Sequence, residues 1–259
     1  MCDTRLGMHY SPPLIKRELE TLLGGTGASF PHWVCRDGER TIFTAKTRHP
    51  FAADDKPAYD KMMEAASRSG TSALEEAEAF LVTYGLSDLT EEFGGTEWIS
   101  LDRLPPLGAN TGVLRSRQMR ASEVAAVTAD IVDLIRSRKP GAPIVFSVSP
   151  IPLKATYSGK DIHIADCLSK STLIAGVNEY FGQLGESDRR VFYFPAYEMF
   201  ISQRHPFEVW QPDGRHPTAR MISHVCKVFA TTFRLSNAEF NEIVDFVVPK
   251  VNATGQRVT

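Results

Sequence analysis

Apolar residues recur along the chain with two different spacings, and each spacing predicts its own kind of element. A repeat of three or four residues, with polar residues between, is typical of helices that bury one face. It predicts helices over residues 11–24, 54–80, 121–138, 164–184, 218–233 and from about 236 to 247. Ser11 and Ser122 are suited to cap two of these helices, and residues 69–72 predict a break in the second.

Shorter apolar runs between the helices predict strands. A hairpin is expected near the N-terminus, where β-like runs over residues 32–36 and 40–44 flank Asp37-Gly38. Residues 94–120 are rich in Gly, Pro and Asn and predict a long surface loop. Two runs, over residues 80–84 and 144–148, are apolar nearly throughout, as is typical of buried strands in a parallel sheet, and residues 190–194 predict a further strand.

Strands that alternate with long helices predict a mainly parallel α/β sheet covered by helices on both faces. No repeat or low-complexity tract interrupts the pattern, so we expect a single domain over residues 1–259 with a frayed tail after about residue 250. Ligands of such sheets bind beyond the carboxyl ends of the strands. Reactive residues in the loops at those ends are therefore the candidates for a functional site.

The composition excludes several classes of protein. A net charge of -2 argues against a nucleic-acid binder that relies on bulk positive charge. No apolar run approaches the roughly 18 residues of a transmembrane helix, and the N-terminus lacks the layout of a signal peptide, so we expect a cytoplasmic protein without a membrane span. The cysteines are scattered and the histidines lack metal-ligand spacing, which predicts no metal and no cofactor. No oligomeric state follows from the sequence.

A chemical candidate lies near the C-terminus, in the segment Pro212-Asp213-Gly214-Arg215-His216-Pro217. Pro217 suits the first position of the helix that follows, so we expect Asp213 and His216 to lie on a tight loop that opens a helix. A carboxylate at this spacing can hold an imidazole in one tautomer, and the imidazole can then act as a general base. A surface pair without a catalytic role has the same residues, so the tetrapeptide alone leaves both interpretations open.

Six segments between roughly residues 5 and 233 form an ordered set: Gly7–Pro12, Thr83–Asp88, Val148–Thr156, Ser169–Ser171, Tyr193–Glu198 and Asp213–Pro217. In this order they resemble the G-x-x-YNP, TLG, SPVPL, S-K-S, YFPSYE and D-x-x-HP elements of the GSCFA family, a branch of the SGNH hydrolases. Each element is common by itself, but the order and spacing of the whole set are specific.

The resemblance implies a fold and a chemistry. The fold is the flavodoxin-like, three-layer α/β/α arrangement of SGNH hydrolases. The chemistry is transfer of an acyl group from a small-molecule or carbohydrate ester through an acyl-enzyme on serine, by a hydrolase or an O-acyltransferase. In this resemblance His216 is the base, Asp213 is its orienting partner, and the Gly85 N–H and Ser87 stabilise the oxyanion. Ser87 stands where the family usually has asparagine.

The sequence departs from the family pattern near its start. The Gly-Ser-Cys-Phe-Ala run, whose serine is the family's nucleophile, does not occur in this sequence. We therefore expect a truncated chain without the first strand, and a catalytically inactive fragment or pseudoenzyme is the alternative to an enzyme. Ser147 or Ser149 is a less favoured substitute nucleophile. Lys170 is interpreted as a solvated lysine at a helix start, with contact to the acyl or sugar group of a substrate as the less favoured alternative.

Overall fold

The computed structural model describes residues 9–24, 30–38, 40–48, 50–101, 103–184, 190–201 and 204–235. These residues form two compact units. The larger unit contains the described residues up to Phe146 together with Leu153–Tyr193, and the smaller unit contains Ser147–Pro152 and the residues from Phe194 onward. None of the described helices combines the length and the apolar character that crossing a bilayer requires. The prediction of one domain over residues 1–259 stays a prediction.

The sheet predicted from the apolar runs is present, with three strands in the order β4 (Phe80–Tyr84), β8 (Ile144–Val148) and β9 (Val191–Phe194). The strands begin together: the N–H at the start of β4 bonds the carbonyl just before β8, and the N–H at the start of β8 bonds the carbonyl just before β9, each at 2.9 Å. The starts lie side by side, so the strands are parallel. The structure is therefore mixed α/β, and the flavodoxin-like arrangement remains a prediction.

The three strands differ in how far their side chains are buried. Every residue of β8, the middle strand, is buried. In β4 only alternate side chains are buried, and Leu81 is 58% exposed. The prediction that residues 80–84 form a fully buried strand was therefore wrong, because only the face of β4 that carries Val82 and Tyr84 is packed.

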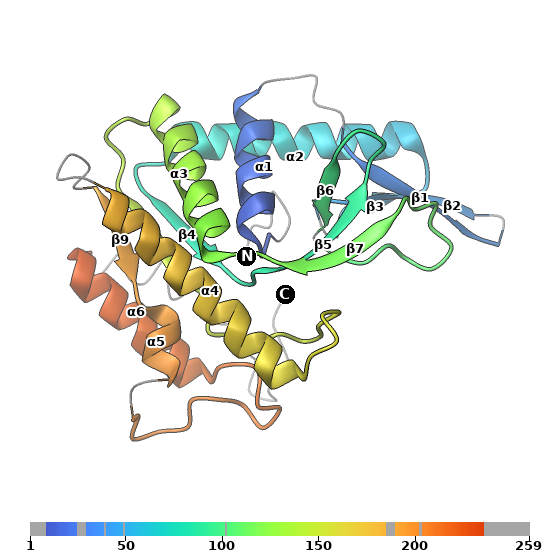
Figure 1. Ribbon diagram of the computed structural model, residues 1–259. Helices are drawn as coiled ribbons and strands as arrows, with labels where there is room; N and C mark the ends of the chain where they lie inside the picture. The colour runs from blue at the N-terminus through green and yellow to red at the C-terminus, as the bar shows by residue number, and fades with distance from the viewer. Residues whose placement is uncertain are drawn as a thin grey trace, which may run out of the picture. The chain divides into compact units, whose positions relative to one another are not determined.

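Four helices accompany these strands in the larger unit: α1 (Pro12–Leu23), α2 (Lys56–Glu76), α3 (Ala121–Arg138) and α4 (Ile162–Gln183). Figure 1 shows α3 and α4 crossing at close range, and α1 lying beside α3. Gly176 marks the crossing, because a Cβ at this position would overlap the Cβ of Val124 and lie 2.6 Å from the Ala121 carbonyl oxygen. Only glycine lets the two helix backbones approach this closely.

Some helix ends and interiors differ from the predictions. The expected break at residues 69–72 is absent, because α2 buries Gly70 and the Thr71 hydroxyl donates to the Leu22 carbonyl, so packing against α1 outweighs the low helix propensity of glycine. At the start of α1 the Ser11 carbonyl accepts backbone N–H groups of the helix, but the Ser11 side chain forms no capping hydrogen bond. At α3 the cap is Arg120, not Ser122, since the Glu123 carboxylate accepts the Arg120 N–H at 2.8 Å.

A second, antiparallel sheet occupies part of the region that was expected to be a loop. β5 (Asp88–Phe93) pairs with β6 (Trp98–Leu101) on one side and with β7 (Leu114–Gln118) on the other. The prediction of an irregular loop over residues 94–120 was wrong for β6 and β7. The sequence of β7, Leu-Arg-Ser-Arg-Gln, has no apolar alternation that would have indicated a strand.

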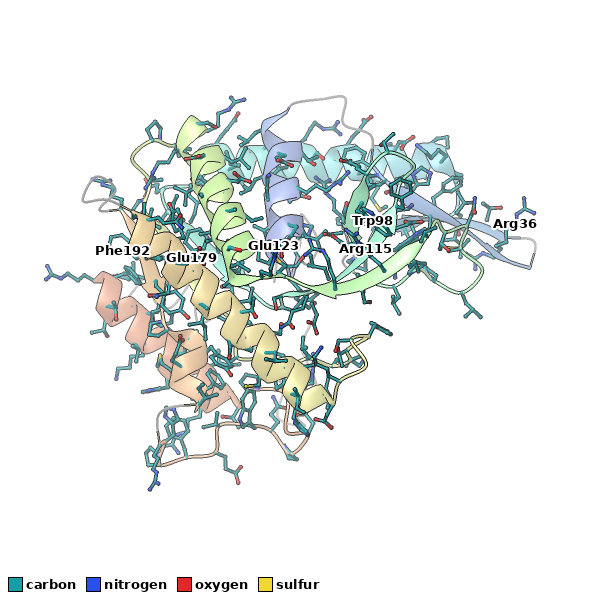
Figure 2. All side chains as sticks on the ribbon, viewed as in Figure 1. Arg36, Trp98, Arg115, Glu123, Glu179 and Phe192 are labelled. Atoms are coloured by element: carbon teal, nitrogen blue, oxygen red, sulfur yellow. The ribbon has the colours of Figure 1, made fainter. Side chains whose placement is uncertain are left out.

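Charged side chains, in place of apolar ones, hold β7 in this sheet. Arg115 and Arg117 donate from their Nε atoms to the same carboxylate oxygen of buried Glu91, at 2.7 and 3.0 Å. The guanidinium of Arg115 also lies 3.9 Å from the ring centroid of Trp98 on β6, and Figure 2 shows the two side chains next to each other. Charge-assisted hydrogen bonds and cation–π contacts of this kind stabilise strands that a hydrophobic pattern does not detect.

The predicted hairpin is confirmed. β1 (His32–Asp37) and β2 (Arg40–Ala45) pair antiparallel, and β3 (Ala52–Ala53) adds a short third strand. Gly38 has φ +59°, a left-handed conformation that favours glycine in the turn. Just after β2, buried Arg48 donates to both carboxylate oxygens of Glu18 at 2.9 and 2.6 Å, which ties this small sheet to α1.

The described residues of the smaller unit form two helices, the chain that joins them and the segment Ser147–Pro152. α5 (Ala196–Ile201) is a short helix that the sequence did not predict, and α6 (Ala219–Phe233) confirms the helix expected over 218–233. Phe194, at the end of β9, packs edge-on against Phe229 of α6 with ring centroids 5.0 Å apart. The last predicted helix, from about 236 to 247, lies outside the described residues.

The α3–α4 crossing leads to a first prediction. Gly176→Ala places a methyl group against Val124 and the Ala121 carbonyl, so we expect it to lower the free energy of unfolding by about 1–3 kcal/mol, measured by urea denaturation. Gly182→Ala on the same helix is the matched control, because no atom lies within 4 Å of its Cβ position. The control should raise stability by up to about 1 kcal/mol. Equal effects of the two changes would show that the crossing tolerates a side chain.

Candidate functional site

The segment around Asp213 and His216 is a hairpin-like loop that ends at α6. The Gln211 N–H donates to the His216 carbonyl at 2.8 Å, and the Thr218 N–H donates to the Val209 carbonyl at 2.9 Å. Gly214, at the tip, has φ +65°, which a side chain would strain. The prediction that the two residues lie on a tight loop opening a helix is therefore confirmed.

The start of that helix differs in detail from the prediction. Pro217 does not take the first helical position, because it forms a bridge with Trp210 before the helix begins. Thr218 is the N-cap instead, and its hydroxyl oxygen accepts the Met221 N–H at 3.2 Å. The same hydroxyl donates to the Glu208 carbonyl at 2.8 Å, so one side chain fixes both the helix start and the loop before it.

Asp213 orients His216 with both of its carboxylate oxygens. Oδ1 accepts the backbone N–H groups of Arg215 and His216 at 2.9 and 3.0 Å. Oδ2 lies 2.5 Å from His216 Nδ1. A carboxylate accepts, so Nδ1 carries the proton and Nε2 is left with its lone pair. The imidazole is thus held in the tautomer that a general base needs, about half exposed to solvent.

The same contacts set the ionisation of Asp213. The hydrogen bond from the His216 ring, followed by those from the His216 and Arg215 backbone N–H groups, holds the pKa of this carboxyl well below its usual value. A carboxyl whose pKa is lower in the folded than in the unfolded state favours folding above the unfolded pKa and loses that contribution as the pH falls through the folded one. Asp213 is therefore ionised at neutral pH, which leaves its carboxylate oxygens available as acceptors.

Arg215 contacts the other nitrogen of the imidazole. Its Nη1 lies 3.4 Å from His216 Nε2. A guanidinium only donates hydrogen bonds, so Nε2 is the acceptor here, in agreement with the tautomer that Asp213 imposes. No sequence pattern points to this arginine, since its contact depends on the turn at Gly214.

In the larger unit, Gly85 follows directly after β4. Its N–H donates to the Tyr10 carbonyl at 2.7 Å, and the Leu86 N–H donates to the same oxygen at 3.1 Å. A Cβ on Gly85 would lie 3.1 Å from that oxygen. Glycine suits this close approach, and Gly85 is not among the described glycines with positive φ.

Ser87, two residues further on, is fully buried against α4. Its N–H donates to the Ser169 Oγ at 2.8 Å, and its hydroxyl donates to the same oxygen at 3.3 Å. Next to it, the Lys170 Nζ donates to the Gly85 carbonyl at 2.6 Å. Both residues assigned to oxyanion stabilisation therefore already have acceptors for their N–H groups.

Lys170 corrects one interpretation from the sequence. It is fully buried within α4 and does not lie in solvent at a helix start. Ser169 was missed as a partner of Ser87, although the serine-lysine-serine motif was visible. The motif gave no sign that its first two residues face the Gly85–Ser87 turn.

The remaining candidates form no further reactive group. Ser147 is buried and donates to the Phe194 carbonyl at 2.9 Å, and the Ser149 Oγ accepts the Ile151 N–H at 3.3 Å, so both serines serve local structure. Within the described ranges, no three histidine, cysteine, aspartate or glutamate side chains gather as a metal site. Asp213 and His216 belong to the smaller unit, and Gly85 and Ser87 belong to the larger one.

Comparison with known proteins gives one match. The model of the GSCFA family matches residues 2–229 of the chain. Neither a curated protein nor a solved structure matches it.

The buried contact of Ser87 with Ser169 leads to a second prediction. Ser169→Ala leaves the buried Ser87 N–H without its acceptor, so we expect a loss of about 1–3 kcal/mol in the free energy of unfolding, measured by urea denaturation. Ser171→Ala, at an exposed position of the same helix, should change stability by less than about 0.5 kcal/mol. A loss no larger than that of the control would mean that this hydrogen bond does not hold the turn.

A third prediction concerns the ionisation of Asp213. A ¹³C NMR titration of the side-chain carboxyl should give a pKa well below its usual value of 3.8 in the unchanged protein. In His216→Ala the pKa should rise toward that value, because the largest cause of the shift is removed. An unchanged Asp213 pKa in this variant would show that the imidazole does not bond the carboxylate in solution.

Proposed function

The chain belongs to the GSCFA family, and from this membership we propose that it is an SGNH-type hydrolase or O-acyltransferase that acts on an ester, with carbohydrate esters as the candidate class. The observation that supports the proposal best is the Asp213–His216 pair. Its carboxylate fixes the imidazole with the proton on Nδ1, so Nε2 is the nitrogen whose lone pair accepts a proton. This is the form in which an imidazole activates a hydroxyl.

In the proposed reaction, His216 Nε2 takes the proton of a serine hydroxyl as the oxygen attacks the ester carbonyl. Asp213 stabilises the imidazolium that forms, and the imidazolium returns the proton to the departing alcohol. The acyl group is then bound to the serine. In the second half, Nε2 takes a proton from water, which releases an acid, or from a sugar hydroxyl, which yields a new ester. In the family the serine lies in the Gly-Ser-Cys-Phe-Ala run, which this sequence does not contain.

The proposal assigns oxyanion stabilisation to the Gly85 N–H and to Ser87. One such donor typically contributes about 3 kcal/mol of barrier lowering. The Gly85 N–H bonds the Tyr10 carbonyl and Ser87 bonds Ser169 in this structure, so both would have to exchange these partners for the oxyanion. Movement of the segment at Tyr10 is thus a required step of the proposed reaction.

The alternative is a catalytically inactive member of the family. Two observations favour it: the sequence lacks the family's serine-containing run, and the turn donors already have acceptors. In that case Asp213 and His216 form a loop that has kept its local geometry without the reaction.

A fluorophosphonate probe, which forms a covalent bond with an activated serine, separates the two functions. If the protein is an enzyme, the probe labels it, mass spectrometry locates one labelled serine, and His216→Ala reduces the labelling at least about 100-fold, because general-base catalysis of this kind contributes 10²–10⁴-fold. His163→Ala, an exposed histidine at the start of α4, is the control and should leave labelling unchanged.

Absence of labelling, or labelling that does not depend on His216, would contradict the proposed enzyme. Hydrolysis of 4-nitrophenyl butyrate provides the matching measurement of turnover. Hydrolysis that is lost in His216→Ala and kept in His163→Ala would contradict the inactive alternative.

A further inference from the structure

Arg215 is a positive charge beside the proposed base that lacks an acidic partner within the described part of the chain. The ion pairs there involve other basic residues, such as Arg48 with Glu18 and Arg117 with Glu91. The nearest carboxylate in sequence, Asp213, bonds the Arg215 backbone N–H and the His216 ring. Among the described residues, no carboxylate therefore neutralises the guanidinium charge.

The hydrogen bonds of this guanidinium are incomplete as well. Its Nη1 makes only a long contact of 3.4 Å to His216 Nε2. Its Nε is shielded from solvent and has no acceptor among the described residues. A buried donor without an acceptor costs free energy, so the observed position of the side chain is weakly held. A better acceptor would draw the guanidinium away from the imidazole.

The contact with Nε2 also has a chemical consequence. The Nε2 lone pair is the one that must take the proton of the attacking hydroxyl, and in this structure a guanidinium N–H points at it. The base is therefore capped while Arg215 stays in place. Whatever moves Arg215 also frees the base.

From these three observations we propose that Arg215 recognises an anionic group on the substrate, a carboxylate or a phosphate close to the ester, and caps His216 Nε2 until that group binds. The planar guanidinium matches the two oxygens of such a group with parallel N–H donors. Binding of the anion supplies the missing acceptor for Nε and uncovers Nε2 in the same movement. This inference rests on the proposed function for its substrate but not for the movement itself.

The movement is tested without any turnover. We expect succinate or inorganic phosphate to change the ¹⁵N shift of His216 Nε2, because the anion removes a hydrogen-bond donor from that nitrogen. Arg215→Gln, which keeps an N–H donor but removes the charge, should abolish the response. Arg220→Ala removes an equal charge from α6, where the guanidinium lies over the Phe207 ring, and should keep the response. A response to one anion only identifies which oxyanion is recognised.

The preference for anionic substrates is tested by turnover. The kcat/KM for 4-nitrophenyl hemisuccinate, divided by that for 4-nitrophenyl butyrate, should fall about tenfold or more in Arg215→Gln, as expected for loss of a charged hydrogen bond. Arg215→Lys keeps the charge but lacks the paired donors of a guanidinium. Its ratio should lie between those of the unchanged protein and Arg215→Gln. Arg220→Ala, the charge control on α6, should leave this ratio unchanged.

The outcomes of the two experiments are separable. Equal ¹⁵N responses in the unchanged protein and Arg215→Gln, or no response in either, would overturn the role of Arg215 whether or not esters are hydrolysed. A response that depends on Arg215 in a protein that no fluorophosphonate labels would support anion recognition and contradict only the proposed enzyme. An unchanged preference ratio in an active protein would overturn substrate selection by Arg215.

Discussion

The close approach of α3 and α4 at Gly176 is the constraint on which the larger unit depends. It sets the position of α4 along its own axis, because a single methyl group there would overlap α3. Ser169 lies seven residues before Gly176, which is two helical turns, and both residues are on the buried face of α4. The crossing therefore also determines where Ser169 and Lys170 meet the Gly85–Ser87 turn. A glycine chosen for packing thus positions two polar contacts on the part of the chain assigned to oxyanion stabilisation.

The sequence predicted the elements whose side chains follow a hydrophobic period and missed those held by charge. The strands at 80–84, 144–148 and 190–194 and the helix at 121–138 were found because apolar spacing encodes them directly. β7 was missed because Arg115 and Arg117 hold it through Glu91, and the partners lie more than twenty residues apart. At Gly70 the opposite error occurred: a helix break was predicted, but a packing contact keeps α2 continuous at a residue that disfavours helices.

The candidate site was predictable to the extent that its contacts are local. Asp213 and His216 lie three positions apart, and their bond follows from the loop that the residues between them form. The partners of Gly85 and Ser87, in contrast, are Tyr10 and Ser169, and no spacing rule connects residues that far apart in the chain. Arg215 was adjacent to the motif but unassigned, because its role depends on the direction in which the turn at Gly214 sends its side chain.

The Asp213 carboxylate has a consequence for how this loop can be inherited. Three N–H groups converge on one side chain, and all of them come from Arg215 and His216. The hydrogen bonds that orient the imidazole therefore all lie within four consecutive residues and involve no distant element. Such a loop can keep its imidazole oriented when other parts of the chain change, so its presence is evidence of this local geometry and not, by itself, of a reaction.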